Sequence, residues 1–156
     1  MKNLLFLSLL VSSLSFQEIT KPEYEIYQFL LNHLILPKTS INLKDSTTNN
    51  IGKLIIGSDD REKEKISIEE YNQFLKKNKL SSQIDISKIN LNYSEEYKRS
   101  AYIEFSRPHI FKDTLCIVYS GVQYAPLNGE GNIYILRYNK EIGKWEVKNK
   151  YLIWIS

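Results

Sequence analysis

The side chains best suited to chemistry lie close together in the last third of the chain, at Ser106, Arg107, His109 and Asp113. A guanidinium group can clamp a carboxylate or phosphate through two hydrogen bonds, and a histidine can act as a general base. This pattern predicts a small hydrolase with these four residues as its catalytic candidates. The competing interpretation, which we favour, is structural: Arg107 pairs with Asp113 or caps backbone carbonyl groups around Pro108.

A second candidate is the segment 123–131, which reads QYAPLNGEG and which we predict to be a loop too long for a simple hairpin turn. An aromatic side chain combined with glycines and amides is typical of a binding loop on a rigid sheet, and loops of this length are often functional. Its candidate ligand-binding residues are Gln123, Tyr124, Asn128 and Glu130. The alternative, that the glycines only provide turn conformations and the segment merely connects two strands, stays open.

The other reactive residues exclude several classes of enzyme. Two histidines and one cysteine are too few for a His/Cys zinc site, and the sequence contains no nucleophile-elbow, zincin or P-loop motif. The run SDDREKEK at 58–65 lacks the glycine and the distal glutamate of a calcium loop, and its mixed charges predict a solvated loop. Cys116 lies in an apolar run, which predicts a buried, inert thiol. The sequence therefore predicts no metal site and no cofactor.

The composition is that of a globular protein. Of the 156 residues, 42% are hydrophobic and 25% are charged, which is ordinary for a folded domain. The formal net charge of +3, to which Lys2 contributes one, gives no basis for binding nucleic acid. Ile, Lys and Asn, whose codons are A/T-rich, are abundant, which favours a bacterial origin.

The N-terminus predicts an export signal. MKNLLFLSLLVSSLSF combines a positive charge at Lys2, a short apolar core and small residues before position 16, so we predict a signal peptide at 1–15 that is cleaved after Ser15. The apolar run is shorter than the roughly 20 residues that a membrane-spanning helix needs. We expect a protein that is periplasmic or secreted, with a single α+β domain at 16–156 and no integral membrane segment after the signal is removed.

Two helices are predicted upstream of the candidate residues. Apolar residues recur at helical spacing from Tyr24 to Leu34, which predicts an amphipathic helix at 22–35. Ser67 and Glu70 have the spacing of a capping box, which predicts a second helix at 68–77.

The positioning scaffold is predicted to be a sheet. Alternating apolar residues predict strands at 40–44, 88–93, 101–106, 115–122 and 133–138, and in the final run from 145 to the end. In that final run Trp145, Val147, Tyr151, Ile153 and Ile155 share one parity, so we predict that they share one face, with Trp145 in the core. The predicted fold is α+β, with two helices packed on a mainly antiparallel sheet that ends in a four-stranded C-terminal meander.

The last third of the chain resembles a family of small exported bacterial proteins of unknown function. The resemblance rests on an S-R-x-x-F segment, a Gly-rich segment, G-K-W and a final W-x-S, at Ser106, Arg107, Phe111, Gly129, Gly131, Gly143, Lys144, Trp145, Trp154 and Ser156. It implies export and a shared fold, and it implies no chemistry. Relatives have cysteines in or before the Gly-rich segment. This chain has Gln123, Tyr124 and Ala125 there, so no disulfide or metal role carries over.

Two functions remain in view. The first is a non-catalytic exported module that binds a protein, glycan or small ligand through the 123–131 segment. The second is the small hydrolase built on the four residues around Arg107. A site that gathers those four side chains favours the enzyme, and their dispersal favours the binding module.

Overall fold

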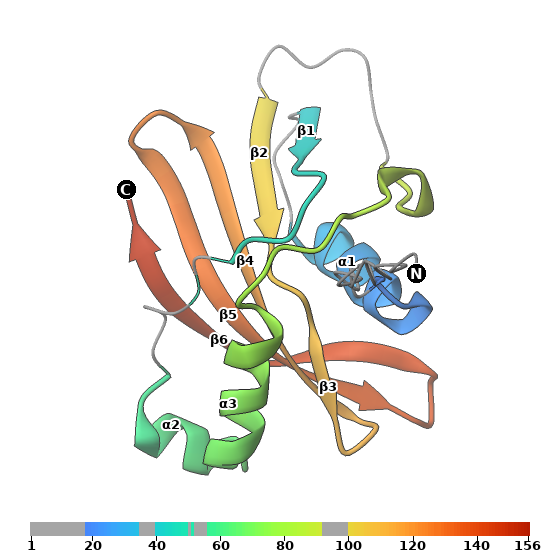
Figure 1. The fold of residues 1–156 in the computed structure, drawn as a ribbon, viewed down its shortest axis with the longest axis vertical. Helices are drawn as coiled ribbons and strands as arrows, with labels where there is room; N and C mark the ends of the chain where they lie inside the picture. Colours follow the sequence, from blue (N-terminus) through green and yellow to red (C-terminus); the bar gives the residue numbers. More distant parts are fainter. Residues whose placement is uncertain (1–17, 35–39, 50, 52–55, 92–99) are drawn as a thin grey trace, which may run out of the picture.

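The computed structural model describes residues 18–34, 40–49, 51, 56–91 and 100–156 (Figure 1). The predicted signal peptide and its cleavage site lie outside the described residues. The elements in chain order are α1 (Lys21–His33), β1 (Ser40–Leu43), α2 (Ser58–Lys63), α3 (Ile68–Lys77), the 3-10 helix η2 (Ile86–Lys88), β2 (Ser100–Phe105), β3 (His109–Phe111), β4 (Leu115–Ala125), β5 (Asn128–Asn139) and β6 (Lys144–Ile155). The predicted α+β class is confirmed.

The strands form one mixed sheet of six members, in the order β1-β2-β4-β5-β6. β3 lies off this path and pairs with β4. β2 and β3 therefore pair with successive parts of the same strand, β4. β1 and β2 are parallel, and the remaining pairs are antiparallel. The mainly antiparallel sheet and its C-terminal meander are therefore confirmed.

The helix predicted at 22–35 is confirmed as α1, which ends at His33, and the helix predicted at 68–77 is confirmed as α3. At the start of α1 the backbone N–H of Thr20 donates to Glu23 Oε2 over 2.7 Å. At the start of α3 the Ser67 hydroxyl accepts the backbone N–H of Glu70 at 3.1 Å, as the capping spacing predicted.

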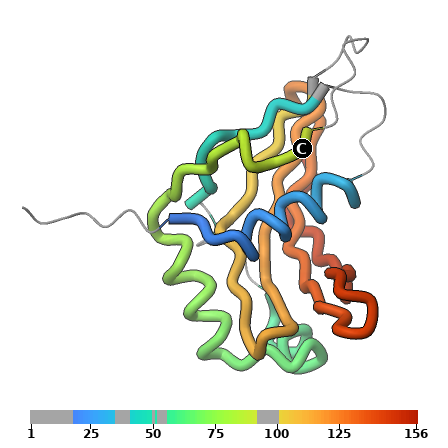
Figure 2. Tube along the Cα trace, turned by 90° about the vertical axis from the view of Figure 1, so that its right-hand side faces the viewer, coloured from blue at the N-terminus to red at the C-terminus, as the bar shows by residue number. Residues whose placement is uncertain are grey.

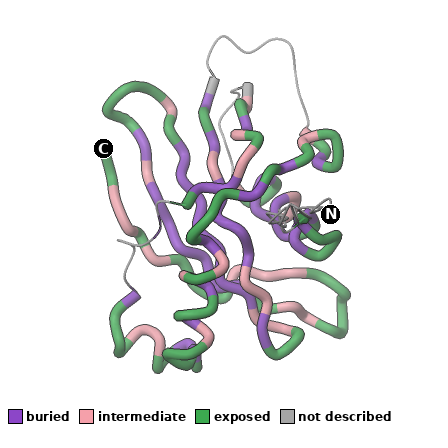
Figure 3. The backbone as a smooth tube through the Cα atoms, in the orientation of Figure 1, coloured by how far each residue is buried: buried purple, intermediate pink, exposed green. Residues whose placement is uncertain are grey.

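Two buried clusters lie on opposite faces of the sheet. Even-numbered residues of β4 and β5, such as Val118 and Leu136, share the first cluster with side chains of α1. Odd-numbered residues, such as Ile117 and Ile135, share the second cluster with side chains of α3. β5 is thus buried on both faces, as predicted, and buried residues concentrate along the middle of the sheet (Figure 3). α1 crosses beside the strands in the view of Figure 2.

Two local predictions were wrong. Residues 58–63, predicted as a solvated loop, form α2, whose acidic first turn and basic last turn complement the helix dipole. Residues 88–91 were predicted as part of a strand, but Lys88 is the last residue of η2 and residues 89–91 follow it. At the start of η2 the Asp85 carboxylate accepts the backbone N–H of Ser87. Residues 92 and 93 of that predicted strand lie outside the described residues.

The prediction that one parity of β6 faces the core was also wrong. Trp145 and Val147 pack against the first cluster, whereas Tyr151 and Ile153 pack against the second. The reason is a β-bulge: Val147 pairs with Leu136 and Asn149 pairs with the preceding Ile135, so Lys148 is an extra residue. Such an insertion moves the following side chains to the other face. A second irregularity, at Ile153, reverses the alternation again, so Ile155 pairs with Glu130 on the face of the first cluster. Trp145 is only half-buried, with its ring edge-on to Tyr138.

Candidate functional site

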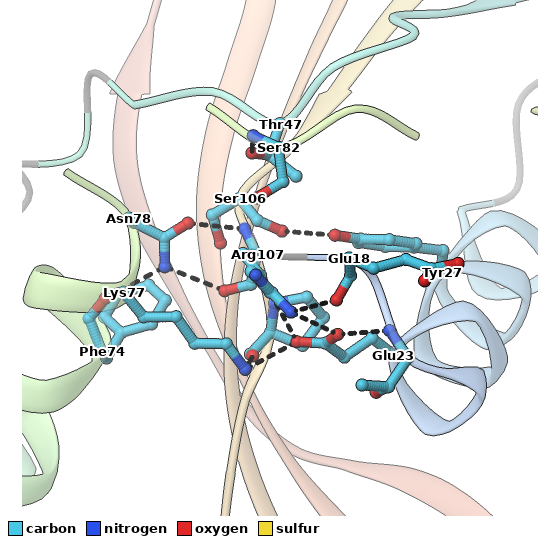
Figure 4. A network of polar contacts seen from close by, with 12 residues as sticks. Glu18, Glu23, Tyr27, Thr47, Phe74, Lys77, Asn78, Ser82, Ser106 and Arg107 are labelled. Carbon is cyan, nitrogen blue, oxygen red and sulfur yellow. Dashed lines mark hydrogen bonds and ion pairs between the residues drawn. The ribbon is translucent and has the colours of Figure 1, made fainter. Parts of the chain in front are cut away.

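The segment that follows β2 lies at the centre of a buried polar network, which we call the Arg107 network and which comprises Glu23, Lys77, Asn78, Ser106 and Arg107 (Figure 4). Arg107 Nε donates to Glu23 Oε1 over 2.9 Å, and a terminal nitrogen donates to Glu23 Oε2 over 3.1 Å. The two residues are 2% and 1% exposed. The two hydrogen bonds pair the Arg107 guanidinium with the Glu23 carboxylate, so each buried charge has a partner of opposite sign.

The end of α3 completes the network. Lys77 Nζ lies 2.6 Å from Glu23 Oε1 and donates to the backbone carbonyl of Pro108 over 2.7 Å. The Asn78 side chain donates to the Arg107 carbonyl and accepts the Arg107 N–H. The hydrogen bonds therefore fix both the backbone and the side chain of Arg107.

The charges of this network hold Glu23 ionised. Burial acts to raise the pKa of Glu23, but hydrogen bonds from Arg107 and Lys77 outweigh burial and lower the pKa from 4.5 to about 2. A carboxylate held in this way binds its own partners and is a poor proton acceptor at neutral pH.

The hydroxyl and the carbonyl of Ser106 both form structural hydrogen bonds. Its hydroxyl accepts the backbone N–H of Tyr119 at 2.8 Å, and its carbonyl accepts the hydroxyl of Tyr27 at 3.2 Å. The side chain thereby continues the pairing with β4 after β2 has ended, and Ser106 has no exposed surface.

His109 and Asp113 lie apart from the Arg107 network contacts. His109 Nε2 lies 3.0 Å from Glu70 Oε2, and the imidazole stacks on Phe111. Asp113 is exposed in the turn between β3 and β4, with a φ of 56°. Their side chains contact different partners: Ser106 contacts Tyr119, Arg107 contacts Glu23, and His109 contacts Glu70. Arg107 pairs with Glu23 rather than with Asp113, a partner that sequence reasoning missed because it lies 84 positions away.

The segment 123–131, predicted as a loop, is mostly strand. β4 continues to Ala125 and β5 begins at Asn128, so the turn is only Pro126-Leu127. The loop prediction was wrong because the strand pairing persists to Ala125 and Asn128, past an irregularity at Tyr124.

The four ligand-binding candidates on this hairpin separate into two groups. Gln123 and Asn128 are exposed. Tyr124 packs against the first cluster, and Glu130 lies on the same face, because cross-strand partners share a face and Glu130 is opposite Val122 of that cluster.

Tyr124 and Glu130 belong to a larger group that we call the tyrosine face, defined by Tyr124, Glu130, Tyr134, Lys150, Leu152 and Ile155. Lys150 Nζ donates to Glu130 Oε1 over 3.3 Å and lies 5.9 Å from the centre of the Tyr134 ring. Leu152 and Ile155 are opposite Asn132 and Glu130 on the edge strand β6, and they are 53% and 72% exposed. The face thus combines aromatic rings, an ion pair and exposed apolar side chains, the mixture found in ligand sites.

Burial and charge also act on the two tyrosine hydroxyls. Burial, with the charge of Glu130 second, raises the pKa of Tyr134 to about 12, and the same two causes raise the pKa of Tyr124. Both hydroxyls therefore stay protonated at neutral pH and can donate hydrogen bonds.

The glycines of the 123–131 segment serve the opposite face of the sheet. A Cβ atom on Gly131 would overlap the indole of Trp154. One on Gly129 would lie 2.7 Å from the Val122 carbonyl oxygen and 3.3 Å from the same ring. The indole nitrogen donates to the Tyr119 hydroxyl over 3.0 Å. The Gly-rich segment is therefore part of a strand against which the Trp154 ring packs, and it is not the loop that the sequence predicted.

A separate open hollow of about 780 Å³ lies along the first half of α1, where Tyr24, Gln28 and Lys88 are among its lining residues. Lys88 already lies over the Tyr24 ring, between Glu18 and Asp85. None of the predicted site residues lines this hollow.

Within the described ranges, no three His, Cys, Asp or Glu side chains gather in a way that could hold a metal ion. Cys116 is buried, as predicted, and burial raises the pKa of its thiol. Among the residues that the structure describes, none of the helices combines the length and apolar character needed to cross a bilayer.

Comparison of the chain with protein-family models, with curated proteins and with solved structures found no match. The resemblance to small exported bacterial proteins therefore stays a prediction from the sequence.

Proposed function

We propose that this protein is an exported bacterial module that binds a ligand on the tyrosine face and performs no chemistry on it. In this proposal α1 and α3 pack on opposite faces of the sheet and hold it rigid. The observation that carries the proposal is the concentration of Tyr124, Glu130, Lys150 and two exposed apolar residues at one end of β4, β5 and β6. A rigid sheet that presents aromatic and apolar groups around a few polar ones suits recognition.

The hydrolase is the weaker candidate. Its serine hydroxyl accepts a backbone N–H, and its arginine is committed to Glu23. His109 contacts Glu70, so the histidine has no nucleophile within reach among its described contacts. An acid–base pair without a nucleophile or an aligned partner does not meet the geometric requirement for acyl transfer.

The test is a binding screen with the isotope-labelled chain 16–156, using oligosaccharides, short peptides and small aromatic amides and acids as probes. We expect a ligand that shifts the amide resonances of β4, β5 and β6 near Tyr124. Tyr124→Ala should weaken its affinity by about thirtyfold, equivalent to about 2 kcal/mol.

Tyr102→Ala is the matched control. Tyr102 is also partly exposed near this end of the sheet, but it is opposite Gln123 and its side chain lies on the other face. We expect no change in affinity for this variant. A ligand whose affinity depends on Tyr102 and is indifferent to Tyr124 would place binding on the wrong face and refute the proposal.

A further inference from the structure

On the face of the sheet that carries the first cluster, two buried polar side chains have no hydrogen-bond partner among the described residues. Ser120 and Asn132 are directly opposite one another on β4 and β5, and neither has any exposed surface. Among the described residues, Ser120 Oγ and both Asn132 Nδ2 and Oδ1 lack a partner. Buried polar groups are nearly always hydrogen-bonded, so three unpaired atoms at one place require an explanation.

The contrast with Asn78 shows that the fold can satisfy such a residue. Asn78 is equally buried, yet its amide donates to the carbonyl groups of Phe74 and Arg107 and accepts the N–H of Arg107. Asn132 has the same chemistry and none of these contacts. The amide of Asn132 is therefore available to a group that is not part of the described chain.

Ser120 and Asn132 adjoin the tyrosine face. Leu152 is the cross-strand partner of Asn132 on β6, and Val122 and Glu130 form the next pair along β4 and β5. Tyr134 and Lys150 form the pair on the other side. Since paired residues share a face, Glu130 lies on one side of the two unpaired side chains and Lys150 lies on the other, with the exposed Leu152 beside them on β6.

We infer that Ser120 and Asn132 form the polar end of the ligand site on the tyrosine face, and that they take the head group of a neutral molecule bearing a carboxamide or hydroxyl on an apolar body. This inference rests on the proposed function and specifies its ligand. The apolar body lies along Tyr124, Leu152 and Ile155.

The donors and acceptors set the class of head group. An asparagine amide offers two donors and one acceptor, and a serine hydroxyl offers both functions, which complements a carboxamide or a hydroxyl. A charged head group would lose its hydration without gaining a counter-ion, because Glu130 and Lys150 already pair with one another. An apolar head group would leave the same atoms unpaired, which is how polar sites reject such analogues.

Entry is from the edge of the sheet. Leu152 is the neighbour of Asn132 on that side and is more than half exposed. Exposed side chains change rotamer within picoseconds to nanoseconds, so in this inference a rotation of Leu152 is the step that admits the head group.

The test uses four probes with one aromatic body and different head groups: phenylacetamide, phenylacetate, phenethylamine and isobutylbenzene. Affinities are measured by titration of the isotope-labelled chain 16–156, with the Asn132 side-chain amide as the reporter. We expect phenylacetamide to bind at least tenfold more tightly than the other three. Ser120→Ala and Asn132→Leu should each reduce its affinity at least tenfold and abolish the preference.

Thermal melting separates this role from a structural one. Because the replaced atoms have no partner, Asn132→Leu and Ser120→Ala should leave the melting temperature unchanged or raise it. Asn78→Leu is the matched control and should lower the melting temperature strongly, since it breaks three hydrogen bonds. A fall for Asn132→Leu as large as that for Asn78→Leu would show that Asn132 is structural and overturn the inference.

The remaining outcomes are also decisive. Equal affinities for the four probes, or no binding of any of them, would overturn the inference. If another ligand depends on Tyr124 and is indifferent to Ser120→Ala and Asn132→Leu, the proposed function stands and the inference falls. If no ligand depends on Tyr124, both fall. Should Asn132→Leu not fold, Ser120→Ala gives the same readouts with a smaller change.

Discussion

Trp154 shows how single residues shape this sheet. Its indole spans the positions of Gly129 and Gly131, and its nitrogen reaches the Tyr119 hydroxyl. Only glycine leaves room for a ring to lie this close to the strand backbone. The pattern of glycines and a distant tryptophan is therefore a packing device.

We expect Gly131→Ala to destabilise the protein by about 1–3 kcal/mol, the usual effect of overpacking, because the added methyl group displaces the indole. In a Trp154→Ala background the same substitution should have little effect, since the ring is gone. A double-mutant cycle by chemical denaturation measures this coupling, which should exceed about 1 kcal/mol. Additive effects of the two substitutions would contradict the contact.

Glu23 gives a prediction with a pH dependence. The folded-state pKa is about 2, below the ordinary 4.5, so the carboxylate stabilises the fold fully above about pH 4.5 and this stability is lost as the pH falls towards 2. The difference corresponds to about 3 kcal/mol. Glu23→Gln should remove a similar amount at neutral pH, because it leaves Arg107 and Lys77 without a counter-ion.

The matched control is Glu25→Gln, on the exposed side of α1. Denaturation curves between pH 2 and 7 should show a steep loss of stability for the native chain and for this control, and a flatter curve for Glu23→Gln. Parallel curves for Glu23→Gln and the native chain would mean that Glu23 does not titrate as described.

At the scale of elements, β6 reaches both clusters through its bulge. The extra residue Lys148 contacts Glu64 Oε2 at 2.8 Å, and the same carboxylate accepts hydrogen bonds from Asn149 and Tyr151. Glu64 follows α2, so this loop secures the position at which β6 changes face. Before the bulge Val147 serves the first cluster, and after it Tyr151 serves the second.

Deletion of Lys148 should therefore destabilise the protein far more than Lys148→Ala. The deletion removes the extra residue and sends the apolar residues on one side of position 148 to the wrong face. The alanine variant keeps the bulge and loses the contact of Lys148 with the buried Glu64 carboxylate, which keeps its hydrogen bonds from Asn149 and Tyr151, so we expect a loss of about 1–3 kcal/mol. Chemical denaturation of both variants makes the comparison, and equal losses would mean that the register is set elsewhere.

The sequence predicted those elements whose causes are local. α3 was predicted from the capping residues Ser67 and Glu70 and from apolar residues at helical spacing. β5 was predicted from a run that is apolar on both faces. It failed where distant residues decide: 88–91 is not a strand, and β4 and β5 extend through the predicted loop because each pairs with the other. Tyr124 and Glu130 could be nominated from their types. Ser120 and Asn132 could not, because a polar residue in a strand is unremarkable until its missing partners are known.

For the whole molecule, the proposal of export makes a direct prediction. When the protein is expressed with its own N-terminus in a bacterium, we expect it outside the cytoplasm as a chain that begins at Phe16. N-terminal sequencing of the exported fraction checks this. A chain that retains Met1 after export would refute the cleavage site. Replacing Leu5 and Leu9 with Asp should keep the protein in the cytoplasm, because the apolar core of the signal is then interrupted.

The Arg107 network also bears on the order in which the chain folds. The contact between Arg107 and Glu23 joins residues 84 positions apart, so it forms only after a very long loop has closed. The hairpins of β3 to β6 close far shorter loops and should form first, with α1 docking after the transition state. Stopped-flow measurements should then find that Glu23→Gln speeds unfolding and leaves the refolding rate almost unchanged. In this order α1 is the last element to dock on the sheet during folding and the first to detach from it during unfolding.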